Sequence, residues 1–149
     1  MIGIEITGLD KLIDKQEKRL RALASEAIQD AAAEVVVRTP VDTGFARASW
    51  WASINSDSGS SNAVENSVAA GDKIAGQASQ SGAPEAIGRL AVTINGVQIG
   101  DTLTVGNSAS YIAALEDGTS NMAPFGMVAA TVNNWPQIVA FRASELARR

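Results

Sequence analysis

The apolar residues at the start of the chain follow two successive patterns. They alternate with Gly3 and Glu5 over residues 2–6, and from residue 9 to residue 38 they recur every three or four positions. Alternation is typical of a strand, and the longer spacing is typical of an amphipathic helix. We therefore expect a first strand and then one long helix lying across a sheet. The helix should stop at Thr39-Pro40, because the residue before a proline is disfavoured in the helical conformation.

The middle of the chain predicts a short helical or extended segment, then a strand, and then a long polar segment. Residues 46–54, with Trp50 and Trp51, indicate a helical or extended lead into a strand ending near Ile54, with one tryptophan in the core and one at an interface. Residues 55–82 are rich in Ser, Asn, Gly and Ala and cannot bury enough area to offset their ordering entropy. This segment is either a loop or an arm that orders only against a neighbouring subunit.

Residues 84–99 carry two conflicting signals. Pro84 suits the first turn of a helix. Asn95-Gly96, flanked by Val92-Thr93-Ile94 and Val97-Gln98-Ile99, is a strong signal for a two-stranded hairpin. Both interpretations stay open from the sequence. Residues 102–105 alternate and predict a strand.

The last third contains an apolar run at residues 111–116, closed by Asp117-Gly118, and then a helical pattern over residues 125–148. Pro136 should kink or restart that helix. Its large apolar residues fall on one face: Val128, Val132, Trp135, Val139 and Leu146. The order of elements predicts one α+β domain over residues 1–149, with a small mixed or antiparallel sheet covered by a long N-terminal helix and a C-terminal helix.

The amino-acid composition excludes several kinds of functional site. The 149 residues include no cysteine and no histidine, so disulfides, thiolate metal sites and histidine bases are excluded. With a net charge of −4 and no concentrated basic stripe, sequence-specific nucleic-acid binding is not expected. No apolar run is long enough to span a bilayer, and no signal peptide is visible. We expect no cofactor and no metal.

Two segments resemble catalytic or metal-binding motifs, and both are better explained as turns. Asp42-Thr43-Gly44 matches the aspartic-protease tripeptide, but that site needs two copies, and Phe45 stands where the proteases have Ser or Thr. We expect a turn in which Gly44 adopts a special backbone angle. Glu116-Asp117 is a weak candidate cation site, because adjacent residues on a strand would point to opposite faces.

Two blocks of sequence resemble one family when they are read together. The first runs from Thr39 to Trp51 and the second from residue 106 to residue 128, with the low-complexity segment between them. Within the first block the matching positions include Pro40, Asp42, Thr43, Gly44, Arg47, Ser49 and Trp50. Within the second they include Asn107, Tyr111, Glu116, Gly118, Thr119, Ser120, Pro124 and Met127.

These blocks are similar to those of a tail-completion family of long-tailed bacteriophages, also described as minor tail or neck proteins. The chain departs from the family at Ser110, often proline, and at Asp117, often aromatic. The resemblance implies a fold like that of tail-terminator and tail-tube proteins. It also implies a non-enzymatic virion component of the head–tail junction, made in the host bacterial cytoplasm.

As the resemblance implies, such a subunit would form a ring, commonly sixfold, with the loop at 107–127 facing partners. Its neighbours would be the tail terminator, the tail tube and the stopper or adaptor, close to the channel DNA. The alternatives are that the chain is itself a terminator or stopper, or an assembly factor absent from the particle.

Overall fold

The computed structural model describes residues 7–40, 44–59 and 82–149. The predicted strand at 2–6, Asp42, Thr43 and most of the 55–82 segment lie outside the described residues. The elements follow in this order: α1 (Leu9–Arg38), α2 (Phe45–Ala48), β1 (Trp50–Ile54), α4 (Ala83–Asn95), β2 (Leu103–Asn107), α5 (Ile112–Asp117) and α6 (Met127–Ala147).

The long N-terminal helix is confirmed at both ends. Gly8, with φ of 83°, precedes the first turn of α1, and Thr39 follows the last turn in an extended conformation. The Thr39 amide still donates to the carbonyls of Val35 and Val36, while Pro40 prevents continuation. The apolar spacing and the Thr-Pro stop together determine these limits.

The two described strands form an antiparallel sheet. Trp50 pairs with Asn107 at one end of the ladder and Ile54 pairs with Leu103 at the other. The ladder is extended by Asn55, whose amide donates to the Thr102 carbonyl and whose side-chain oxygen accepts from the Thr102 amide. The predicted lead at 46–54 is therefore a short helix followed by a strand, and the α+β class is confirmed.

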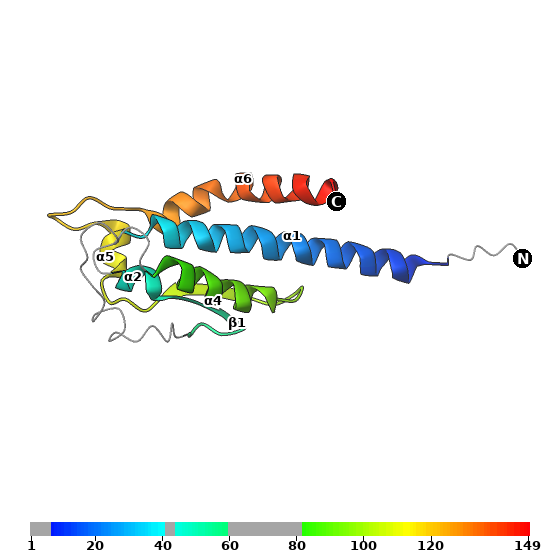
Figure 1. Cartoon of the computed structure of the whole chain (residues 1–149), viewed down its shortest axis with the longest axis horizontal. Helices are drawn as coiled ribbons and strands as arrows, with labels where there is room; N and C mark the ends of the chain where they lie inside the picture. Colours follow the sequence, from blue (N-terminus) through cyan, green and yellow to red (C-terminus); the bar gives the residue numbers. More distant parts are fainter. Residues whose placement is uncertain (1–6, 41–43, 60–81) are drawn as a thin grey trace, which may run out of the picture.

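The elements stack in layers, with α6 on α1, α1 on α4, and α4 on the sheet (Figure 1). The core lies where α1, α4 and β1 meet, and it includes Val36, Trp50, Leu90 and Ile94. Thus α4, rather than α1, is the helix that packs directly on β1. Trp50 is buried in this core, whereas Trp51 is only half-buried.

The helical interpretation of residues 84–99 is correct, and no hairpin forms around Asn95-Gly96. Pro84 lies in the first turn of α4, and the helix continues to Asn95. Its buried positions recur at three- and four-residue intervals: Ala83, Ala86, Leu90 and Ile94. The carbonyls of Asn95 and Val97 then accept hydrogen bonds from Arg21 of α1. Burial of this apolar face overrides the local turn signal.

The C-terminal helix differs from expectation in the face that it buries. α6 continues through Pro136 as one helix, so of the two predicted outcomes the restart does not occur. Pro136 and Val132 are both exposed, so the carbonyl that loses its amide donor lies on the solvent side. Furthermore, the buried residues of α6 are Met127, Thr131 and Ile138, whereas the large apolar residues of the predicted face are partly exposed.

Polar contacts explain which face of α6 turns toward α1. Arg142 makes a bidentate contact with Asp30, with one N–O distance of 2.7 Å, and a longer contact with Glu26. Asn134 donates to Glu34 at 2.9 Å. Arg142 and Asn134 lie beside Thr131 and Ile138 in the helical repeat. When these polar side chains face α1 to make their hydrogen bonds, the large apolar residues of α6 point to the side of the contact with α1.

Leu90→Ala should destabilise the protein by about 2–5 kcal/mol, because Leu90 is almost fully buried between α1 and β1. The matched control is Val92→Ala on the same helix, where the side chain is 76% exposed; its effect should stay below about 0.5 kcal/mol. Urea unfolding followed by circular dichroism measures both. Equal effects would contradict the orientation of α4.

Asn134→Ala should raise the pKa of Glu34 toward its ordinary value. In the wild type the hydrogen bond from Asn134, together with Arg38, holds that pKa below the ordinary value. A lowered carboxyl pKa stabilises the folded state above the ordinary pKa, and this contribution is lost as pH falls through the lowered one. Titration of the Glu34 carboxyl by NMR, with stability measured across the same acidic range, tests both statements.

Candidate functional site

The residues of the first block close the C-terminal end of α1. Arg47 of α2 donates from Nε to the Thr39 carbonyl at 2.7 Å and from Nη2 to the Val37 carbonyl at 2.9 Å. The last carbonyls of a helix lack amide donors and carry partial negative charge, so a guanidinium there is favourable. Burial lowers the pKa of Arg47 from its ordinary value.

Thr39 and Trp50 connect this helix end to the core. The Thr39 hydroxyl donates to the Val35 carbonyl at 2.8 Å and accepts from the Trp50 indole N–H at 2.9 Å. Both side chains are buried, so the hydrogen bond satisfies two polar groups that would otherwise be costly to bury. Ser49, also buried, donates from its hydroxyl to the Phe45 carbonyl.

Two glycines allow the chain to turn closely at this junction. Gly44 has φ of 85°, as predicted for the turn, and lies directly before α2. Gly82 has φ of 78°, and a Cβ placed on it would lie 2.7 Å from the Gly44 carbonyl oxygen. Pro40 is half-buried beside the end of α1.

Asn107 joins the second block to the first. Its side-chain amide donates to the Ala46 carbonyl at 2.7 Å, and its side-chain oxygen accepts from the Ala109 amide. The Ser108 amide also donates to the Ser49 carbonyl. Residues about 60 positions apart thus form one hydrogen-bonded junction. Its members are Thr39, Arg47, Ser49, Trp50 and Asn107.

Glu116 holds the start of α6. Its two carboxylate oxygens accept from the amides of Val128 and Ala129, both at 2.9 Å. These are first-turn amides without helical partners, and the helix dipole favours a negative charge there. The strand expected at this point is instead the helix α5, so the argument from opposite strand faces was wrong. Glu116 is engaged in capping a helix.

The residues between α5 and α6 form an exposed loop at the end of the molecule opposite the start of α1 (Figure 1). Gly118 has φ of 78° and ψ of 179°, and a Cβ there would lie 2.7 Å from the Met122 carbonyl oxygen. Thr119 and Met122 pair across a tight turn that leaves Ser120 exposed. Some of the predicted loop residues are thus exposed, while others are partly buried and hold the conformation of the turn.

The other residues of the second block follow the same division. Met127 is fully buried at the start of α6, and Pro124 is exposed. Tyr111 is 42% exposed, and its ring centroid lies 6.4 Å from that of Phe45 in the first block.

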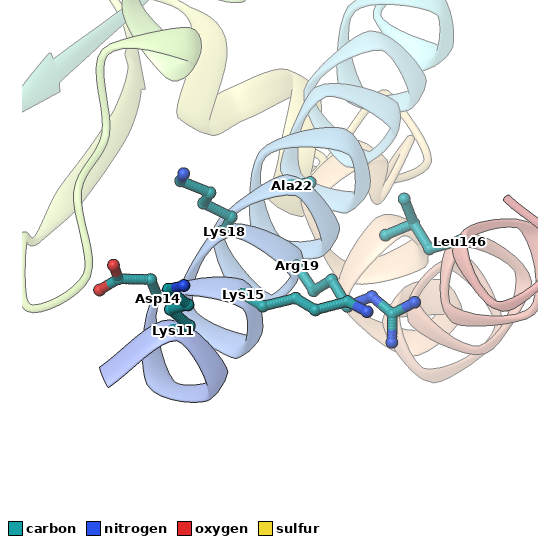
Figure 2. Close-up of a pocket in the computed structure, with 7 residues that line it drawn as sticks. All are labelled: Lys11, Asp14, Lys15, Lys18, Arg19, Ala22 and Leu146. Atoms are coloured by element: carbon teal, nitrogen blue, oxygen red, sulfur yellow. The ribbon is translucent and has the colours of Figure 1, made fainter. Parts of the chain in front are cut away.

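A groove lined by basic residues from the start of the chain lies where α6 ends beside α1. Arg19 and Lys15 extend toward Leu146 of α6, while Lys18 and Asp14 point to the other side of α1 (Figure 2). A second groove on this line is mostly apolar and is lined by Leu20, Leu23, Ala143 and Leu146, among others.

The start of α1 is little covered by the other described elements, whose contacts there include Leu146 beside Arg19 and the hydrogen bonds from Arg21 to residues after α4. Every residue from 7 to 21 is exposed, and Leu9, Leu12, Ile13 and Leu20 are each more than half exposed. We call residues 9–21 the α1 extension. One face of it forms the extension stripe, which consists of Leu9, Ile13, Gln16 and Leu20.

A partly exposed apolar row lies along α6, with Val139 half-buried at its end. We call it the α6 stripe, and it consists of Val128, Val132, Trp135 and Val139. Val132 is 64% exposed, and Trp135 is 39% exposed. Apolar periodicity locates both stripes in the sequence, but it assigns them to the core.

The described residues include no cluster of three or more Asp or Glu side chains that could hold a metal ion. No helix among them is long and apolar enough to cross a membrane. Comparison of the chain with protein-family models, with curated proteins and with solved structures finds no match. The resemblance to the phage family therefore rests on the two sequence blocks.

Glu116→Ala should destabilise the protein by about 0.5–2 kcal/mol and increase hydrogen exchange at Val128 and Ala129, because both amides lose their acceptor. Asp117→Ala is the matched control, since Asp117 is exposed beside it. Hydrogen exchange followed by mass spectrometry over residues 127–130 measures the difference. Unchanged exchange in Glu116→Ala would contradict the capping role.

Proposed function

We propose that this chain is a structural subunit of a tailed bacteriophage, located at the head–tail junction or the head-proximal end of the tail. It acts by assembling into a ring, and six copies is the number that the family resemblance suggests. The two sequence blocks support the phage assignment, and the partly exposed apolar side chains on α1 and α6 support an assembly role. Contiguous exposed apolar patches are typical of interaction sites.

The energetics favour an assembly role. The three large aliphatic side chains of the extension stripe, at positions 9, 13 and 20, are each about half exposed, and covering the remainder of each is worth about 1 kcal/mol. The α6 stripe adds a similar amount. One such contact only approaches the association cost of about 4–15 kcal/mol, so it is weak alone. Ring closure gives every copy two contacts, which favours a closed assembly over isolated pairs.

The roles of the motif residues also support the proposal. Arg47, Asn107 and Glu116 are engaged with backbone groups of helix ends and turns. A motif made of caps and turns specifies a shape, and a shared shape is what a structural subunit requires. We propose no catalytic role for Asp42 or for Glu116.

The proposed partners are further copies of the chain and the neighbouring proteins of the junction: the tail terminator, the tail tube and the stopper or adaptor. The exposed loop after α5, with Ser120 and Pro124 at the surface, is the proposed contact with a different neighbour. It lies at the end of the molecule away from the α1 extension (Figure 1), so the two surfaces can serve two partners at once.

Quantitative mass spectrometry of purified virions tests this function. We expect this chain to be present at a small fixed number of copies per particle, in a constant ratio to the other proteins of the junction. The major capsid protein serves as the internal standard. Absence from purified particles would contradict the virion role and favour an assembly factor that acts before the particle is complete.

A further inference from the structure

The side of α1 that receives α6 changes its charge along the helix. In its later part it presents carboxylates to α6: Asp30 makes a bidentate contact with Arg142, and Glu26 makes a longer one. Nearer the start of the helix, the same side carries Lys15 and Arg19. The later part of this side is therefore complementary to a basic helix, and its start is complementary to an acidic one.

An exposed apolar row runs beside these two basic residues. Leu12, Leu20 and Leu23 fall within one sector of α1 in the helical repeat, next to Arg19. Leu12 is 54% exposed and Leu20 is 58% exposed. At the end of α6, Leu146 joins Leu20 and Leu23 in lining one groove. The groove therefore has apolar residues along one side and basic residues along the other.

The basic side of this groove is not neutralised within the described part of the chain. Figure 2 shows Lys15 and Arg19 extending toward Leu146, while Asp14 points to the other side of α1. The basic side chains of the lining form no ion pair with any described residue. They are Lys11, Lys15, Lys18 and Arg19.

The mixed chemistry of the groove favours a helix from another protein. Nucleic acid would be attracted to the basic residues but would gain nothing from the leucines, and a flat lipid surface does not fit between two helices. The α6 helix of a second copy has the wrong charge, because residues 127–149 include three basic residues and one acidic residue. An acidic amphipathic helix complements both sides of the groove.

We propose that the groove between the α1 extension and the end of α6 binds an acidic amphipathic helix of a neighbouring protein. This helix lies on α1 in line with α6, over residues 9–20, which is about 17 Å or three helical turns. Its apolar side chains pack on Leu12 and Leu20, and its carboxylates meet Lys15 and Arg19. The inference rests on the proposed assembly role and names the chemistry of one partner, but it does not depend on the phage assignment.

A helical peptide tests this site by fluorescence anisotropy with the full-length protein. The probe is a fluorescent, hydrocarbon-stapled helix with leucines on one face and glutamates beside them, and the control peptide has lysine at each glutamate position. We expect the glutamate peptide to bind about tenfold more tightly than the lysine peptide, and its affinity to fall as sodium chloride is added. Equal affinities for the two peptides would overturn the proposal.

Matched variants on α1 locate the binding. Arg19→Gln should weaken the glutamate peptide about threefold, whereas Arg38→Gln, which removes the same charge at the other end of α1, should not. Leu20→Ala should weaken it about threefold, whereas Val37→Ala should not, although the two side chains are 58% and 57% exposed. All four positions are exposed, so the thermal unfolding curves should stay close to the wild type. Equal effects in the test and control variants would contradict the site.

Two further results would assign the groove to a different occupant and overturn the proposal. One is binding of duplex DNA more tightly than the glutamate peptide, with no change in Leu20→Ala, which would assign the basic residues to phosphate. The other is dimerisation of the protein alone, detected by light scattering and abolished by Leu20→Ala, which would assign the groove to a second copy.

Failure of this inference is distinguishable from failure of the proposed function. If virions contain the chain but the glutamate peptide does not bind, the subunit role stands and the groove has no acidic partner. If the peptide binds as expected but virions lack the chain, the groove keeps its partner chemistry and the virion role is wrong.

Discussion

The closure of α1 by Arg47 is the contact on which the arrangement of the other elements depends. The guanidinium donates hydrogen bonds to the carbonyls of Val37 and Thr39 at the helix end. These bonds hold α2 against the end of α1. Trp50 follows α2 directly and donates to Thr39, so its ring enters the core at a defined position. β1 then starts beside α4, where Arg89 donates to the carbonyls of Ala48 and Trp50, so hydrogen bonds join the central helix to this junction as well.

The same use of polar side chains recurs at the other junctions. Asn107 ties the end of β2 to α2, and Glu116 holds the first turn of α6. Within the described residues, no buried side-chain polar atom lacks a hydrogen-bond partner. The core is small and rich in alanine, so these polar contacts specify the geometry that apolar burial alone would leave loosely defined. The two sequence blocks thus supply many of the residues that make the turns and helix ends.

The helices carry more apolar surface than this core can use. The α1 extension runs beyond the body of the protein, and the α6 stripe is turned away from α1 by the Arg142–Asp30 and Asn134–Glu34 contacts. The polar pairing between α1 and α6 thus determines which apolar side chains of α6 remain at the surface. This partly exposed apolar surface is the physical basis for the proposed assembly role.

Local chemistry in the sequence determined much of this fold. The length of α1 followed from apolar spacing and Thr39-Pro40, and the turn glycine from Gly44, because these signals act within a few residues. Only the tertiary structure decided between helix and hairpin at Asn95-Gly96, where burial of Leu90 and Ile94 outweighed the turn preference. It also decided which face of α6 is buried, since periodicity shows that a face is apolar but not what covers it. The roles of Arg47 and Glu116 likewise depend on segments distant in the chain, and no local pattern could have revealed them.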